Sequence, residues 1–148
     1  MFYFAYGSNM DLKRIEDLGL RLHSINFGYL PGWKLIFNVI DDPQDKSGYA
    51  NIIPHPGAKV EGLIIETNGA GIKKLDWNES IPNFYRRKKV TVIGPKKREL
   101  ECITYVGNPK RLARGLKPRR AYMNHLLNGK LFLHPKYLKK LEAIETLD

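Results

Sequence analysis

The sequence predicts an α+β fold, with a small, mostly antiparallel, barrel-like sheet and flanking helices. Short strand-like segments follow one another with few helical segments between them, and helical patterns lie near both ends of the chain. No repeat, low-complexity tract or shift in composition marks a linker. A chain of 148 residues is long enough to bury one core, so we expect a single domain over residues 1–148.

Seven apolar or alternating runs are typical of short strands, and together they predict a sheet of six or seven strands. They are residues 2–5, 20–29, 33–40, 49–54, 60–67, 84–93 and 99–106. Turn-forming residues separate them, notably Pro31-Gly32, the polar loop 41–48 and His55-Pro56-Gly57. The last two runs flank residues 94–98, which indicate a hairpin.

Four segments show helical spacing: about residues 10–18, 72–78, 118–127 and 135–144. In the first, Leu12, Ile15 and Leu18 fall on one face, and Asn9 or Asp11 can cap its start through a side-chain oxygen. The last two each begin with a proline, which is favoured in the first turn of a helix.

Composition excludes several classes of protein. Hydrophobic residues make up 43% and charged residues 27%, and no apolar run approaches the length of a membrane span. The first residues lack the pattern of a signal peptide, so we expect a cytoplasmic protein. A single cysteine, Cys102, excludes an internal disulfide framework and a cysteine-rich zinc site, and its alternating segment predicts a core position.

The net charge of +10 is concentrated in three basic stretches, residues 86–89, 96–98 and 110–120. Such stretches can neutralise phosphates and give salt-dependent binding of nucleic acid. They are also typical of a solvated surface, which is the interpretation that we favour. A nucleic-acid partner therefore stays an alternative.

The segment Tyr6-Gly7-Ser8-Asn9 ends the first predicted strand and precedes the first predicted helix. A strand that passes through glycine into a helix start leaves several backbone N–H groups unpaired. Such groups can bind a carboxylate or stabilise a developing oxyanion. A tight turn with an asparagine cap would produce the same pattern, so spacing alone leaves both interpretations open.

Two acids, Asp76 and Glu79, flank Trp77 near the end of the short central helix. A glutamate held against apolar surface has its ionised form disfavoured, so its pKa rises toward neutrality and it can act as a base. The alternative is an acid that decorates a helix end. The histidines have no metal-ligand spacing, and we expect surface or core roles for all four of them: His23, His55, His125 and His134.

Several segments, taken in order along almost the whole chain, resemble the γ-glutamyl cyclotransferase family, whose wider relatives are the AIG2-like proteins. They are YFAYGSNM (residues 3–10), ANIIP (50–54), VEGL (60–63), LDWNE (75–79), Tyr85, Pro118 and Tyr122 followed by Gly129, and LEAI (141–144). Arg119 departs from the family pattern, which has a serine after the proline.

The resemblance implies a γ-glutamyl cyclotransferase-like fold and an enzyme that releases 5-oxoproline and a free amine or amino acid from a small γ-glutamyl substrate. It implies Glu79 as the catalytic base, without cofactor or metal. The residues expected to bind substrate are Tyr6, Gly7, Ser8, Asn9, Tyr85 and Tyr122. The loop 41–48 and Arg119 are the expected rim, which would choose between a γ-glutamyl amino acid and a γ-glutamyl amine. A non-catalytic binding module of the same fold is the alternative, and the oligomeric state is not predicted.

Overall fold

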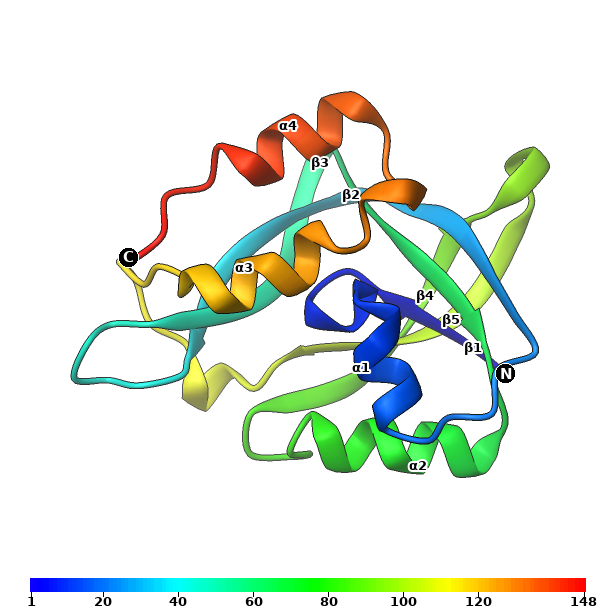
Figure 1. The fold of residues 1–148 in the computed structure, drawn as a ribbon, viewed down its shortest axis with the longest axis horizontal. Coiled ribbons are helices and arrows are strands. Elements are labelled where there is room, and N and C mark those ends of the chain that lie inside the picture. The colour runs from blue at the N-terminus through cyan, green and yellow to red at the C-terminus, as the bar shows by residue number, and fades with distance from the viewer.

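The computed structural model describes residues 1–148 and shows five strands that close into a barrel, with helices packed around it (Figure 1). Around the barrel the strands follow the order β1-β3-β2-β4-β5. Their bounds are β1 Phe2–Ala5, β2 Ser24–Ile40, β3 Gly48–Glu66, β4 Tyr85–Ile93 and β5 Glu99–Gly107. Only β1 and β5 pair in parallel. The predicted α+β fold with a mostly antiparallel, barrel-like sheet is confirmed.

The expectation of six or seven strands is wrong, because two pairs of predicted strands are each one long strand. β2 runs through Pro31-Gly32, and β3 runs through His55-Pro56-Gly57. The β2–β3 register shifts between Pro31 and Trp33, and Gly32 and Gly57 adopt positive φ values of 82° and 84°. Bulges accommodate proline and glycine in paired strands without ending them. These residues therefore bend the β2–β3 ribbon instead of terminating it.

The strand β1 closes the barrel, since it pairs with β3 on one side and β5 on the other. It is short and almost fully buried, as an apolar strand covered on both faces should be. The hydroxyl of Thr104 on β5 donates to the carbonyl of Phe4 at 2.8 Å. Opposite, β3 approaches so closely at Gly62 that a Cβ there would lie 2.2 Å from the Ala5 carbonyl oxygen. The chain therefore leaves β1 from a tightly fixed position.

The helices are α1 Leu12–Asp17, α2 Gly69–Asn78, α3 Arg120–Leu127 and α4 Pro135–Glu142. The predicted helix over residues 10–18 is interrupted: a 3-10 turn, Ser8–Met10, precedes α1, and Asp11 between them is extended. The side chain of Asp11 caps α1 by accepting from the Lys13 N–H at 3.1 Å. It also binds His125 Nδ1 at 2.8 Å and Asn128 Nδ2 at 3.0 Å, which ties α1 to α3.

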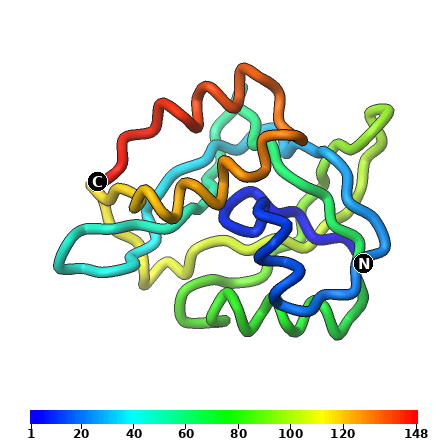
Figure 2. The backbone as a smooth tube through the Cα atoms, in the orientation of Figure 1, coloured from blue at the N-terminus to red at the C-terminus, as the bar shows by residue number.

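The backbone trace in Figure 2 shows how segments distant in sequence meet. The turn after β1, drawn in blue, lies beside α3, and residues of these two elements are in contact. The helix α2 packs at the opposite edge of the barrel from α4 (Figure 1). No helix in the structure is long and apolar enough to cross a membrane.

Candidate active site

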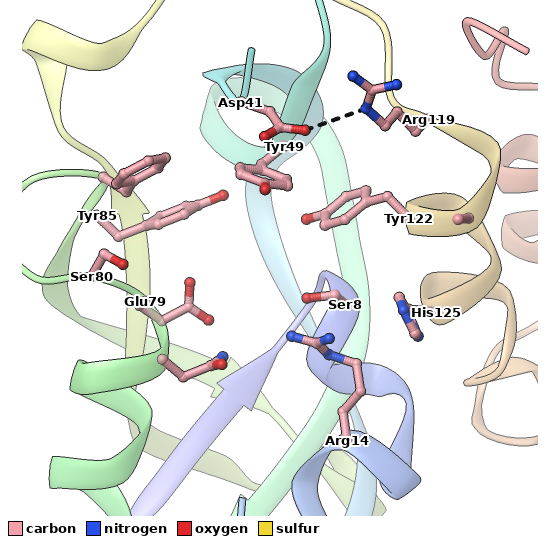
Figure 3. Close-up of a pocket in the computed structure, with 13 residues that line it drawn as sticks. Ser8, Arg14, Asp41, Tyr49, Glu79, Ser80, Tyr85, Arg119, Tyr122 and His125 are labelled. Atoms are coloured by element: carbon pink, nitrogen blue, oxygen red, sulfur yellow. Dashed lines mark ion pairs between the residues drawn. The ribbon is translucent and has the colours of Figure 1, made fainter. Parts of the chain in front are cut away.

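A cavity of about 410 Å³ opens where the turn after β1, the end of α2, the loop after β2 and the face of α3 meet (Figure 3). A recess of about 30 Å³, enough for one water molecule, adjoins it, and the two share Ser8, Glu79, Tyr85 and Tyr122. The recess adds Tyr6, Gly7 and Asn9 to its lining. Glu79 and all six residues expected to bind substrate thus line the cavity or the adjoining recess, and of the loop 41–48 only Asp41 does.

Glu79 is the C-cap residue of α2, and its backbone N–H donates to the carbonyl of Leu75. Its side chain points into the cavity toward the turn after β1 (Figure 3). One carboxylate oxygen, Oε1, accepts a hydrogen bond from Asn9 Nδ2 at 3.1 Å. An acid from the middle of the chain therefore meets the N-terminal turn.

Burial raises the pKa of Glu79 to about 7, against the opposing effects of the Arg14 charge and the Asn9 hydrogen bond. Trp77, two residues before this acid, is 87% exposed and is not the surface that buries it. The recess beside the carboxylate is lined by five tyrosines, namely Tyr3, Tyr6, Tyr85, Tyr105 and Tyr122.

The turn after β1 supplies backbone donors. Met10 and Asp11 use their N–H groups within the turn, whereas no turn or loop hydrogen bond involves the N–H of Gly7, Ser8 or Asn9 as donor. All three residues line the recess next to Glu79. A Cβ on Gly7 would lie 3.5 Å from the Tyr122 hydroxyl oxygen, so a side chain there would enter this space.

The three tyrosines predicted to bind substrate have different hydrogen bonds. Tyr6 donates to the carbonyl of Tyr105 and is a buried part of the barrel. Tyr85 donates to the carbonyl of Ala50 at 2.7 Å, so its proton is already used. Tyr122 accepts from the Ala50 N–H at 3.0 Å and lines both the cavity and the recess. Of the three, Tyr122 is the one whose hydroxyl does not donate to a backbone carbonyl.

The end of α2 is fixed by a second acid. Asp76 Oδ1 accepts from Arg87 Nε at 2.8 Å and from the Tyr105 hydroxyl at 2.7 Å, and its other oxygen forms an ion pair with the same guanidinium. Although burial opposes it, these hydrogen bonds and the Arg87 charge lower the pKa of Asp76. Asp76 thus holds α2 to β4 and β5, three residues before Glu79.

Sequence reasoning missed Arg14, Tyr49 and His125, which also line the cavity. It named Arg119 and the loop 41–48 as the rim, and the structure places Arg119 and Asp41 there, 3.6 Å apart between Arg119 Nε and Asp41 Oδ2. His125 and Arg14 belong to short helices whose exposed faces carry many polar residues. Nothing in their spacing distinguishes them from surface residues.

A family model described as gamma-glutamyl cyclotransferase, AIG2-like, matches residues 3–125. The chain therefore belongs to the γ-glutamyl cyclotransferase, AIG2-like family. It is 30% identical to the γ-glutamylcyclotransferases of Bos taurus and Homo sapiens, in alignments of 155 positions that each cover 99% of this chain and 79% of the relative.

Solved structures agree on the fold. A structure described as gamma-glutamyl cyclotransferase superposes with a TM-score of 0.83 at 27% identity, over 99% of this chain and 88% of that one. The yeast γ-glutamyl cyclotransferase specific to glutathione superposes with a TM-score of 0.72 at 12% identity, over 95% and 93% of the two chains. At that identity the second likeness shows the fold alone.

Proposed function

We propose that this protein is a cyclotransferase that converts a γ-glutamyl amino acid or γ-glutamyl amine into 5-oxoproline and the free amine, with Glu79 as general acid and base. The observation that carries the proposal is the desolvated Glu79 carboxylate, which faces a small-molecule cavity beside unpaired backbone donors. Membership of the family and the activity named for its mammalian relatives support the same reaction.

The substrate carries its own nucleophile, because its α-amine can reach its γ-carbonyl and close a five-membered ring. At neutral pH this amine is an ammonium, so a base must first remove a proton. Glu79 takes the proton, the nitrogen lone pair attacks the γ-carbon, and a tetrahedral oxyanion forms. At this stage the ring nitrogen still carries two protons. When the bond to the leaving nitrogen breaks, Glu79 gives its proton to that nitrogen, takes the surplus proton of the ring nitrogen, and passes it to the free amine, which leaves as an ammonium. A carboxyl group with a pKa of about 7 is suited to these transfers.

The oxyanion needs hydrogen-bond donors that are already in place. Gly7, Ser8 and Tyr122 line the same recess as Glu79, and they offer two backbone N–H groups and a hydroxyl. Donors fixed in a water-poor site stabilise developing charge without reorganising during the reaction. We assign these three groups to the γ-carbonyl oxygen. The assignment explains why the chain turns so sharply after β1.

The proposal is tested by Glu79→Gln, which preserves the shape of the side chain but cannot take up a proton at neutral pH. We expect release of 5-oxoproline from γ-glutamyl substrates to fall by about 100-fold or more, as is typical for loss of a general base. Glu101→Gln is the matched control, since Glu101 is exposed on β5 and forms only a long surface ion pair with Lys89. Parent-like activity in the folded Glu79→Gln protein would refute the mechanism.

A further inference from the structure

We propose that Arg14 binds the α-carboxylate of the substrate, so that the enzyme acts only on γ-glutamyl groups whose α-carboxyl is free. The inference rests on the proposed function and names a substrate requirement that the reaction itself does not impose. Ring closure needs the α-amine and the γ-carbonyl, whereas the α-carboxyl takes no part in bond making or breaking.

The charges that line the cavity leave one cation without a partner. Arg119 pairs with Asp41, and His125 pairs with Asp11 at 2.8 Å. The side chain of Arg14 forms neither an ion pair nor a hydrogen bond, although it lines the cavity together with Glu79. A γ-glutamyl head group carries one ammonium and one carboxylate. The two remaining charged groups of the cavity match this head group: Glu79 can bind the ammonium, and Arg14 can bind the carboxylate.

Buried polar atoms without hydrogen-bond partners also indicate a ligand site beside Glu79. Three buried side-chain polar atoms in the molecule have no hydrogen-bond partner: Asn9 Oδ1, Arg14 Nε and Tyr137 Oη. The first two belong to residues beside Glu79, and Asn9 is only 2% exposed. Figure 3 shows the guanidinium of Arg14 directed into the cavity between Ser8 and Glu79. A buried polar group without a partner is costly, which indicates that a ligand completes this set.

Covalent geometry selects the α-carboxylate over a carboxylate in the leaving group. In an amino acid the carboxylate carbon lies only about 2.5 Å from the amine nitrogen, so its anchor must lie near the base that receives the amine proton. Arg14 meets this condition, since its charge is the largest influence opposing the burial of Glu79. The other cation at the mouth, Arg119, is already bound by Asp41 and Asp45.

The requirement has a chemical consequence. A peptide with N-terminal glutamine presents the same α-amine and the same γ-amide, but its α-carboxyl is part of a peptide bond. Ring closure is equally possible there, and only recognition of the α-carboxylate excludes it. The inference therefore predicts that Arg14 separates free γ-glutamyl compounds from glutaminyl peptides.

The test combines two proteins with two substrates. L-γ-glutamylmethylamide and its α-carboxamide analogue are each given to the parent and to Arg14→Gln, and release of methylamine is measured. Loss of a charge-assisted hydrogen bond corresponds to roughly 10- to 100-fold in kcat/KM. Relative to the parent on L-γ-glutamylmethylamide, we expect kcat/KM to fall by that factor for the parent on the carboxamide analogue and for Arg14→Gln on L-γ-glutamylmethylamide. Arg14→Gln on the carboxamide analogue should show little further loss. Arg14→Lys should recover part of the loss, and Lys13→Gln, an exposed cation on the same helix, should behave as the parent.

Three outcomes would overturn the inference. An equal loss on both substrates would make Arg14 merely structural. A loss that appears with γ-glutamylglycine, whose leaving group has a carboxylate, but not with the methylamide would assign Arg14 to the leaving group. If no γ-glutamyl compound reacts, the proposed function fails instead, and calorimetry still tests the anchor. The Glu79→Gln protein should then bind L-γ-glutamylmethylamide at least about 10-fold more tightly than its α-carboxamide, and comparable binding of the two would refute the anchor.

Discussion

At the scale of single residues, the pKa of Glu79 results from opposing environments. Burial disfavours its ionised form, while the Arg14 charge and the Asn9 hydrogen bond favour it. The other groups that face it are the buried hydroxyls of surrounding tyrosines, and burial raises the pKa of Tyr3, Tyr6 and Tyr122 as well. These phenols stay protonated at neutral pH. Glu79 is therefore the group of this cluster that changes charge near pH 7.

This balance predicts the pH dependence of activity. The proposed mechanism requires the base form of Glu79, whose pKa is raised to about 7, so kcat/KM should rise with pH through about 7 and then level off. An ordinary glutamate would place that rise near 4.5. The check is the initial rate of 5-oxoproline release between about pH 5 and 8.5. A profile already flat above pH 5.5 would show that the catalytic acid is not the buried Glu79.

The same shift has a cost in stability, with a defined sign. An acid whose pKa is raised on folding binds protons more tightly in the folded state, so stability falls as pH rises from about 4.5 to 7. Glu79→Gln removes this cost, and it should unfold at a higher temperature than the parent at pH 8 but not at pH 4.5. Identical differences at the two pH values would contradict the burial argument.

At the scale of elements, α2 is the part that delivers the acid. Asp76→Asn removes the charge that holds Arg87 and weakens the contact with Tyr105. Because Arg87 is 46% exposed, we expect a loss of only about 1–2 kcal/mol in the free energy of unfolding. Displacement of Glu79 should lower kcat about 10-fold or more while KM changes less. Glu101→Gln, which removes another ion pair between strands, should change neither stability nor kcat measurably.

The positions of most helices and strands, but not the continuity of β2, could be predicted from the sequence. Strand and helix positions were predicted to within a few residues, because apolar alternation and capping residues are local signals. The continuity of β2 through Pro31-Gly32 was not predictable in this way. A proline and a glycine end most strands, whereas here the β2–β3 pairing resumes after a register shift, with residues 55–58 of β3 left in the bulge.

For the site, the motif residues were predicted and their partners were not. Glu79 and the turn Tyr6–Asn9 were predicted from the family resemblance, since local spacing left the role of each open, and the structure brings them together. Arg14 follows Lys13 on a short helix and has the same local signature as a solvated cation. The sequence does not distinguish Tyr85 from Tyr122, whereas in the structure Tyr85 donates to the Ala50 carbonyl and Tyr122 accepts from the Ala50 N–H. Such distinctions depend on long-range packing, which no local pattern encodes.

At the scale of the whole molecule, part of the +10 charge has a structural use. Arg87 fixes α2, and Arg111 donates to the carbonyl of Ile40 at 2.9 Å while its guanidinium lies 3.9 Å from the centroid of the Phe84 ring. These cations belong to two of the three basic stretches that suggested a nucleic-acid partner. The contacts favour a structural and solvated role for the basic residues over a polyanion-binding surface.

Barrel closure sets the geometry of the site, because β1 must stop at a fixed place for its turn to face Glu79. Gly62 permits this closure, since a Cβ there would lie 2.2 Å from the Ala5 carbonyl oxygen and 3.1 Å from the Phe4 ring. Gly62→Ala must push β1 away from β3, and we expect a loss of about 3 kcal/mol or more in the free energy of unfolding. Urea titration followed by circular dichroism measures it.

The matched control is Gly69→Ala at the start of α2. A Cβ at Gly69 meets nothing within 4 Å, and alanine in a helix reduces the entropy lost on folding. This variant should therefore be as stable as the parent or slightly more stable. If Gly62→Ala unfolded at the same urea concentration as Gly69→Ala, the close approach of β1 and β3 would not be what holds the turn after β1 against Glu79. The position of the cavity would then have to be explained by the packing of α3 and α1 alone.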